Sequence, residues 1–172
     1  DEAVKNMEMK GCCNAVKEAL EHVVASGKDF VEEEFMRPCE DRYARHLLYL
    51  DPEKRYSVLA MVWAPGQGTA IHDHAGMWCV ECVYRGRITV TSYSCDKEEG
   101  DRYWFTKEKE IIAGIGDAGA LIPPFDHHTI VNTFDEKAVT IHVYGGEMTW
   151  SDCFLPDGDS YLRVRKELSY TP

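Results

Sequence analysis

The sequence predicts one mainly β domain, a small barrel or double-sheet jelly roll, with helices at its N-terminal end. From residue 56 onward, short segments rich in Val, Ile, Tyr and Thr are separated by Gly, Pro and Asp, a pattern typical of antiparallel sheets. Before residue 50, apolar residues recur at helical spacing instead. The length of 172 residues suits a single core. We therefore expect one domain over residues 1–172, in which a mostly helical segment at 1–50 packs on a barrel at 56–170.

The N-terminal segment contains two helix candidates. In the first, apolar pairs follow one another at three- and four-residue spacing from Ala15 to Val24, and Gly27 ends the helix. The second runs from Phe30 to Met36, is acidic on one face and ends before Pro38. Both are expected to cover the barrel.

The barrel region contains short strand candidates separated by turn signals. Arg85-Gly86, the segment 134–137 and Pro156-Asp157-Gly158 are typical of tight turns. The expected strands are Tyr56–Trp63, Trp78–Tyr84, Arg87–Tyr93, Arg102–Phe105, Glu110–Ala113, Ala120–Ile122, Thr129–Asn132, Ala138–Tyr144 and Ser160–Glu167.

Composition excludes several classes of partner. The formal net charge of −11 repels phosphate backbones, so we expect no nucleic-acid partner. No apolar run approaches the roughly 20 residues of a membrane span, so we expect no membrane partner either. The seven cysteines are irregularly spaced and form no CxxC pair, which favours a reducing cytoplasm. The oligomeric state stays open and a monomer is compatible with the sequence.

The most informative stretch is His72-Asp73-His74. Residues i and i+2 of a strand point to the same face, so both imidazoles can bind one ion inside a barrel. Asp73 would point to the opposite face, which indicates a structural role rather than a ligand. An HxH pair alone is a weak signal, because this spacing also arises by chance.

Residues at fixed distances on either side make the HxH signal more specific. The spaced residues are Gly66, His72, His74, Cys79 and Gly86 in a first block, and Pro123, His128 and Asn132 in a second. They resemble the two sequence motifs of the cupin superfamily, whose fold is a double-stranded β-helix barrel. The chain departs from the pattern at Cys79, where most cupins have a Glu ligand, and at Phe125, where the second motif has Gly. The Pro and Asn spacing favours His128 over His127 as the third ligand.

The resemblance implies a metal site of His72, His74 and His128 without a carboxylate ligand. Three neutral imidazoles leave open positions on an octahedral ion and do not compensate its charge, which favours an anionic ligand such as a thiolate. Fe(II) that binds substrate and oxygen together fits this arrangement. Zinc with three histidines would also be stable, and the ligand set does not exclude it.

The combination of HxH with Cys at the position of the usual Glu resembles the cysteine dioxygenase (thiol dioxygenase) family of cupins. Thr140, His142 and Tyr144 are similar to the family's Ser-x-His-x-Tyr strand, with Thr in place of Ser. The resemblance implies a hydrogen-bond relay through these side chains and a thioether bond that can join Cys79 to Tyr144.

Tyr43-Ala44-Arg45 is similar to the family's Tyr-x-Arg, whose arginine grips the substrate carboxylate. Relatives specific for 3-mercaptopropionate tend to have Gln at the Arg45 position and no Cys at the Cys79 position. The resemblance therefore implies L-cysteine as substrate, with O2 as co-substrate and cysteine sulfinic acid as product. It departs at Gly145-Gly146, where mammalian members have Ser-Pro-Pro.

Two alternatives remain open from the sequence. The chain could be a dioxygenase for another small thiol, such as 3-mercaptopropionate or mercaptosuccinate. It could also be a metal-binding cupin without catalytic activity.

Overall fold

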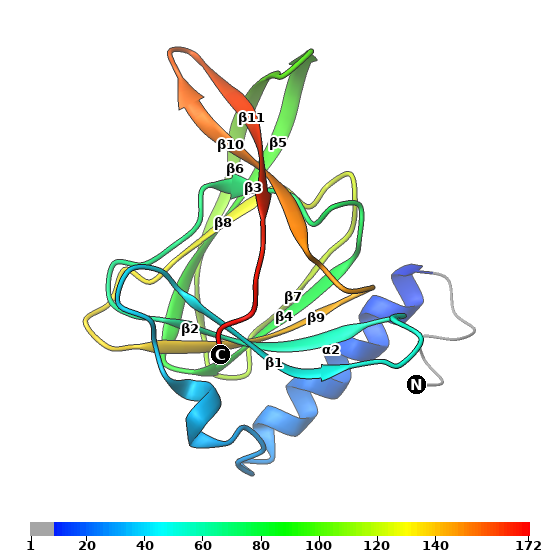
Figure 1. Cartoon of the computed structure of the whole chain (residues 1–172), viewed down its shortest axis with the longest axis vertical. Helices are drawn as coiled ribbons and strands as arrows, with labels where there is room; N and C mark the ends of the chain where they lie inside the picture. Colours follow the sequence, from blue (N-terminus) through cyan, green and yellow to red (C-terminus); the bar gives the residue numbers. More distant parts are fainter. Residues whose placement is uncertain (1–8) are drawn as a thin grey trace.

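The computed structural model describes residues 9–172, which form two β-sheets with helix α2 packed against the first (Figure 1). Residues 1–8, which the predicted domain includes, lie outside the described residues. The mainly β fold class is confirmed, with 49% strand and 13% helix.

Helix α2 spans Met9–Ala25 and ends just before Gly27, whose φ of 67° favours glycine. Cys12 and Cys13 are buried against Val80 of the first sheet. The two cysteines therefore serve as apolar packing residues of the helix.

The first sheet is antiparallel and has five strands. Their order across the sheet is β1 (Ala44–Leu50), β2 (Ser57–Trp63), β9 (Ala138–Tyr144), β4 (Cys79–Arg85) and β7 (Ala118–Leu121). Gly86 connects β4 to β5 in a tight turn with φ 73°, and a Cβ there would lie 2.7 Å from the carbonyl oxygen of Lys137. Only glycine satisfies both conditions.

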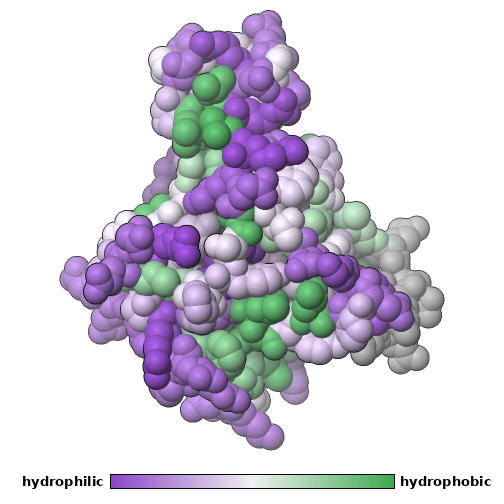
Figure 2. Space-filling view, in the orientation of Figure 1, coloured by the Kyte–Doolittle hydropathy of each residue, from purple (hydrophilic) through white to green (hydrophobic). Residues whose placement is uncertain are grey.

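The second group of strands closes into a ring. In order these are β10 (Trp150–Asp157), β11 (Ser160–Glu167), β6 (Arg102–Gly114), β5 (Arg87–Glu99), β8 (His128–Val131) and β3 (Ile71–His72). The β5–β6 and β10–β11 hairpins project together from the rest of the molecule (Figure 1). This projecting part exposes apolar side chains on its β10–β11 hairpin (Figure 2), including Leu155, Leu162 and Val164.

Strand β9 explains how the first sheet is covered on both faces. All seven of its residues are buried. Val139, Ile141 and Val143 pack in the clusters on the helix side, whereas Tyr144 packs in the cluster inside the barrel. Because side chains alternate along a strand, Thr140 and His142 also face the interior.

The structure differs from the predicted elements in several places. Residues 44–50, expected in the helical segment, form β1, whose burial pattern does not alternate cleanly. Residues 150–157 form β10, which was not predicted because Pro156 and two aspartates weaken its strand pattern. The two strands expected at 102–105 and 110–113 are one strand, β6, with an exposed polar middle. The helix expected at 30–36 is reduced to the short 3₁₀ helix η1 (Glu33–Met36).

Within residues 9–172, no helix has the length and apolar composition needed to span a bilayer.

Candidate active site

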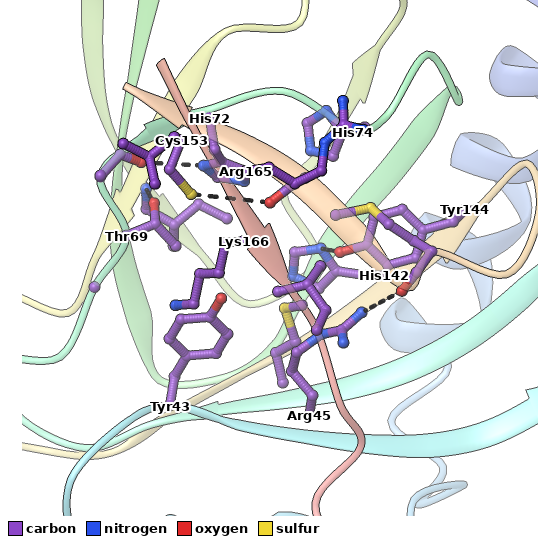
Figure 3. Close-up of a pocket in the computed structure, with 18 of the residues that line it drawn as sticks. Tyr43, Arg45, Thr69, His72, His74, His142, Tyr144, Cys153, Arg165 and Lys166 are labelled. Atoms are coloured by element: carbon purple, nitrogen blue, oxygen red, sulfur yellow. Dashed lines mark hydrogen bonds between the residues drawn. The ribbon is translucent and has the colours of Figure 1, made fainter. Parts of the chain in front are cut away.

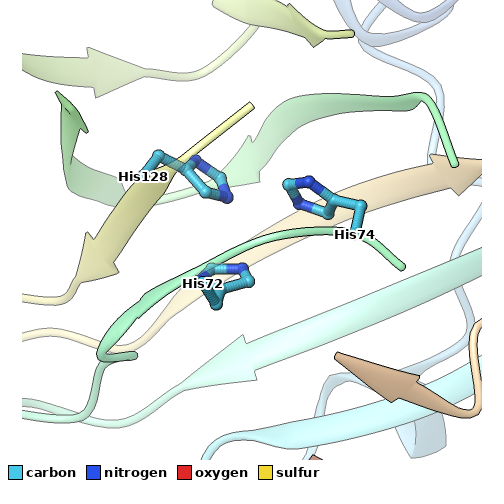
Figure 4. A group of neighbouring side chains, drawn as sticks. All are labelled: His72, His74 and His128. Atoms are coloured by element: carbon cyan, nitrogen blue, oxygen red, sulfur yellow. The ribbon is translucent and has the colours of Figure 1, made fainter. Parts of the chain in front are cut away.

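Three histidines from two segments of the chain converge in the structure (Figure 4). His72 on β3 is paired with His128 at the start of β8. His74 lies just beyond β3, in a turn closed by a 2.9 Å hydrogen bond from Met77 N to His74 O. One nitrogen of each ring lies within 4.8 Å of the others. The HxH pair thus converges although only its first histidine is in a strand.

Burial keeps the imidazoles of His72 and His128 neutral. It acts with the neighbouring His74 to lower the pKa of His72 to about 3. The same cause, together with His72, holds the pKa of His128 well below its ordinary value. Neutral imidazole is the form that binds a metal ion.

Two of the three rings are oriented by acceptors at Nδ1. His74 Nδ1 lies 3.0 Å from a carboxylate oxygen of Asp126, which also accepts the His74 backbone N–H at 3.1 Å. His72 Nδ1 lies 3.1 Å from the carbonyl oxygen of Ala70. Because each Nδ1 faces an acceptor, each Nε2 is available for a metal ion.

His128 differs, since both of its ring nitrogens are buried without a hydrogen-bond partner. A metal ion at Nε2 would satisfy one of these nitrogens. The three-histidine set therefore fits a metal ion by the convergence of its ring nitrogens and by an otherwise unpaired donor.

Two buried carboxylates lie beside the histidines. For Asp126, burial alone would raise the pKa, but the hydrogen bonds from His74 and the charges of His74 and His127 together outweigh it, so the pKa is lowered. Glu81 lies 3.7 Å from Nδ1 of both His128 and His142, and burial raises the pKa of its carboxyl to about 8. The expectation of three histidines without a carboxylate thus describes the ligand set but not its surroundings.

A hydrogen-bonded chain runs along the inner face of β9. Trp63 Nε1 donates to Thr140 Oγ1 at 2.8 Å, and Thr140 Oγ1 lies 2.8 Å from His142 Nε2. Indole is only a donor, so the Thr140 hydroxyl hydrogen is available to His142 Nε2. This assigns the His142 proton to Nδ1, which lies 3.4 Å from the Tyr144 hydroxyl.

Cys79 on β4 is paired directly with Tyr144 on β9. Its Sγ lies 3.9 Å from His142 Nδ1, and burial raises the thiol pKa by more than a hydrogen bond with Tyr144 lowers it. Burial, followed by the neighbouring Cys79, also raises the pKa of the Tyr144 hydroxyl well above its usual value. Both side chains are therefore protonated at neutral pH and face each other across the two strands.

A cavity of about 260 Å³ opens beside the histidines (Figure 3). Its lining brings together Tyr43, Arg45, His72, His74, His142 and Tyr144. His128 lies behind this surface, and so do Cys79 and Thr140. The predicted residues therefore form one site, part of which lines the cavity and part of which supports it.

Arg45 is buried, with 4% of its surface exposed, and its guanidinium faces the cavity. Its Nη2 donates to Met148 O at 3.2 Å and its Nη1 to Ser169 O at 3.3 Å, while Nε has no partner. Within residues 9–172 it forms no ion pair with an acidic side chain, unlike Arg55, which pairs with Asp51. A buried cation without an anion is costly, so an anionic group in the cavity would be stabilised beside Arg45.

Tyr43 stacks on Trp63 with 4.6 Å between ring centroids and forms the wall beside Arg45. The wall after Tyr144 is shaped by Gly145, where a Cβ would lie 2.3 Å from Nε1 of Trp78. The departure from the family pattern at this position therefore lets the Trp78 indole pack directly on the backbone.

The other predicted alternatives lie apart from the cluster. His127 packs against Phe105 and Phe154, with ring centroids 5.0 and 5.2 Å away. Asp73 Oδ1 accepts the backbone N–H groups of Ala75 and Asp152 at 3.1 and 3.0 Å. These contacts give both residues a packing or turn-forming role.

Several residues of the site were not predicted. Glu81 follows Cys79 by two positions on the same face of β4, so alternation along the strand was the available signal for it. Asp126 lies just before β8, outside any strand. The β10–β11 hairpin and the segment after it supply Cys153, Val164 and Lys166 to the cavity lining. Nothing in the sequence of this part indicated such a position.

Solved structures with a similar fold include TT1209 from Thermus thermophilus. It has 19% identity and a TM-score of 0.52, over 69% of this chain and 95% of that one. A conserved protein with a double-stranded β-helix domain from Klebsiella pneumoniae has 18% identity and a TM-score of 0.51. That match covers 70% of this chain and 94% of the other. At this identity the similarity shows the fold, which is the double-stranded β-helix of the cupins.

The sequence itself matches a protein family. The family model described as cysteine dioxygenase type I matches residues 21–153. This range contains the three histidines, Arg45, Cys79 and the hydrogen-bonded series Thr140, His142 and Tyr144, here called the β9 relay. With most of its length matched, the chain belongs to the cysteine dioxygenase type I family.

Proposed function

We propose that this protein is an iron(II)-dependent thiol dioxygenase that oxidises L-cysteine with O2 to cysteine sulfinic acid. The observation that carries the proposal is the pairing of two receptors in one cavity. Three histidines suited to a metal ion lie on one side, two of them in the cavity lining, and a buried guanidinium without an acidic partner lies on another. Family membership supports dioxygenase chemistry for such a site.

In this proposal Arg45 binds the substrate carboxylate. Two of its N–H groups are held by the carbonyl oxygens of Met148 and Ser169, which fixes the direction of the guanidinium. The remaining N–H groups, including the unpaired Nε, are free to form a forked contact with a carboxylate. The anion also supplies the charge that the buried cation lacks.

Tyr144, oriented by His142 and Thr140, supplies a hydroxyl hydrogen to the cavity. The His142 proton on Nδ1 faces the Tyr144 oxygen, so the hydroxyl hydrogen can point toward a bound substrate. Its raised pKa keeps this hydroxyl protonated at neutral pH. We assign it to holding a proton beside the reacting sulfur and oxygen.

His72, His74 and His128 would hold the iron(II) ion, which when bound would supply the redox chemistry for adding O2 to a thiolate sulfur. The balance is R–SH plus O2 giving R–SO2H, so both oxygen atoms remain in the product. Neither an external reductant nor an organic cofactor is required.

Oxygen uptake by the iron(II)-loaded protein with L-cysteine tests the proposal directly. We expect one O2 consumed per cysteine and cysteine sulfinate as the product. 3-Mercaptopropionate, mercaptosuccinate and cysteamine serve as the comparison panel. Uptake with one of these thiols in place of cysteine would overturn the substrate, and no uptake with any thiol would overturn the enzyme assignment.

We also propose that a thioether bond forms between Cys79 Sγ and a ring carbon of Tyr144, supported by their direct cross-strand pairing. The S–H and C–H bonds are lost as two protons and two electrons, which the co-substrate O2 takes up. Cys79→Ser should remove any crosslinked species from denaturing gels and intact-mass spectra while part of the activity remains. Cys95→Ser, at an exposed cysteine, is the matched control. If the gel bands and the mass of the crosslinked species persist in Cys79→Ser, the bond does not involve Cys79.

A further inference from the structure

We propose that Glu81 is a positioning residue that accepts the Nδ1–H of His128 and thereby holds this ring ready to bind a metal ion through Nε2. The same carboxylate faces His142, so it joins the metal site to the β9 relay. This inference rests on the metal site of the proposed function, and it adds a residue that the three-histidine pattern does not contain.

The first step of the argument is the difference among the three histidines. His72 and His74 have Nδ1 acceptors at 3.1 and 3.0 Å, whereas His128 Nδ1 is buried without a hydrogen-bond partner. A metal-binding histidine normally donates its other N–H to a carboxylate, a carbonyl or water. His128 therefore needs an acceptor to match those of the other two rings.

The second step is that Glu81 lies where this acceptor is needed. Its Oε1 is 3.7 Å from His128 Nδ1, and its Oε2 is 3.7 Å from His142 Nδ1. Both contacts are longer than a hydrogen bond but within ion-pair distance. Each oxygen thus faces a different ring, and a short movement of one side chain closes either contact.

The third step concerns the cost of keeping a carboxyl group at this place. The Glu81 side chain is only 12% exposed, and its Oε2 is buried without a hydrogen bond. Within residues 9–172 its ion-pair contacts are with imidazoles alone, and Lys or Arg does not contribute. A buried carboxyl without a cation destabilises the fold, so packing alone does not explain it.

The fourth step is how the fold places Glu81. It lies on β4 two residues after Cys79, so both side chains point into the barrel. The neighbouring inward residue Val83 is apolar and belongs to the interior cluster. Glu81 is thus an ionisable residue set into an otherwise apolar strand face, behind the histidines and away from the lining of the substrate cavity.

A carboxylate behind a metal-binding imidazole has two effects. It fixes the ring orientation and tautomer, and it makes the nitrogen that faces the ion more basic. Loss of such a partner typically weakens metal affinity by about 10- to 100-fold. Because Glu81 also faces His142, its removal should also change the environment of Tyr144 at the other end of the relay.

The test measures Co(II) binding to the metal-free full-length chain by calorimetry and by the visible spectrum of the bound ion. The variants are Glu81→Leu and Glu81→Gln, with Glu108→Gln as the matched control at an exposed glutamate of β6. We expect about 10- to 100-fold weaker binding for Glu81→Leu. A smaller loss and a shifted spectrum are expected for Glu81→Gln, which keeps an acceptor but not the charge.

Thermal unfolding of the metal-free variants separates positioning from a structural role. Removal of a buried, unpaired carboxyl should leave the melting temperature equal or higher, while metal affinity falls. If Glu81→Leu does not fold, Co(II) affinity and melting temperature are compared for Glu81→Gln instead. Wild-type affinity in the folded Glu81 variants, or affinity lost only together with stability, would overturn the inference.

The experiment distinguishes a failure of the proposed function from a failure of the inference about Glu81. A wild-type protein that binds Co(II) but consumes no O2 with any thiol contradicts the proposed function, while the affinity ratio still decides the role of Glu81. A wild-type protein that binds no metal ion overturns both.

Discussion

Two walls of the same cavity differ in burial and in hydrogen bonding. The inner wall is β9, where every residue is buried and where Thr140, His142 and Tyr144 form a hydrogen-bonded series. The rim is the β10–β11 hairpin, where Leu155 is 45% exposed and Val164 is 40% exposed, although both line the cavity. The residues proposed to take part in the reaction thus lie on the buried wall, and the solvent-exposed side chains of the cavity lie on the projecting hairpin.

The difference follows from strand position. Strand β9 has β2 and β4 as neighbours and is covered by helix α2 on its outer side. The hairpin projects beyond the sheets, and much of its surface faces water (Figure 1). Substitutions on the inner wall should therefore change the reaction rate, and substitutions on the rim should change little.

The largest expected effect is at His128, which lies beside the inner wall. His128→Ala removes a nitrogen donor and should lower iron content and reduce kcat/KM by about 10³-fold or more, since metal activation is worth several kcal/mol. Iron analysis together with oxygen uptake measures both quantities. His127→Ala, one residue away but packed on Phe105, should retain iron and activity. Equal losses in both variants would reassign the third ligand.

The next effect is at Tyr144. Tyr144→Phe keeps the ring but removes the hydroxyl that His142 orients, and kcat should fall by about 10²-fold, the lower end of general acid–base contributions. Steady-state oxygen uptake gives kcat and KM separately. A change confined to KM would show that the hydroxyl binds substrate rather than serving the reaction.

The third effect is at Arg45, which lines the cavity together with residues of both walls. Arg45→Ala should raise KM for cysteine by about 10- to 100-fold, because a charge-assisted contact contributes about 1.5–3 kcal/mol. Cysteamine has no carboxylate, so its KM should stay the same. The two substrates are compared in one oxygen-uptake assay, and equal losses for both would remove Arg45 from carboxylate binding.

The smallest effect is expected on the rim. Leu155→Ala shortens a half-exposed side chain and should change kcat/KM by about twofold or less, with unfolding free energy within about 0.5 kcal/mol of wild type. Chemical denaturation and oxygen uptake measure these quantities. A loss comparable to that of Tyr144→Phe would mean that the rim closes on the substrate.

The fold class and the family could be predicted from the sequence because both depend on local spacing. Alternation identifies β9, and the distances between Gly66, His72 and Cys79 carry the family pattern. The roles of the supporting residues depend on contacts between distant segments. Asp126 meets His74 across 52 positions, and Arg45 is held by Ser169 across 124. No pattern within one segment encodes such a contact.

Two strands that were not predicted, β1 and β10, were obscured by different features of their sequences. The sequence of β1 mixes Arg45 and His46 with apolar residues because its polar side chains are buried and hydrogen-bonded rather than solvated. Strand β10 contains Pro156 near its exposed end, where a missing N–H is tolerated. Polar residues inside a strand hid the first, and a proline near its end hid the second.

The hydrogen bonds that hold Arg45 also have a consequence for the order in which the site is synthesised. The ribosome makes residue 45 early, but the carbonyl groups of Met148 and Ser169 that direct its guanidinium are made much later. The backbone of Thr171 then pairs with Arg45 through the 2.8 Å hydrogen bond from Thr171 N to Arg45 O. All three histidines have therefore been synthesised before the surroundings of Arg45 can be completed.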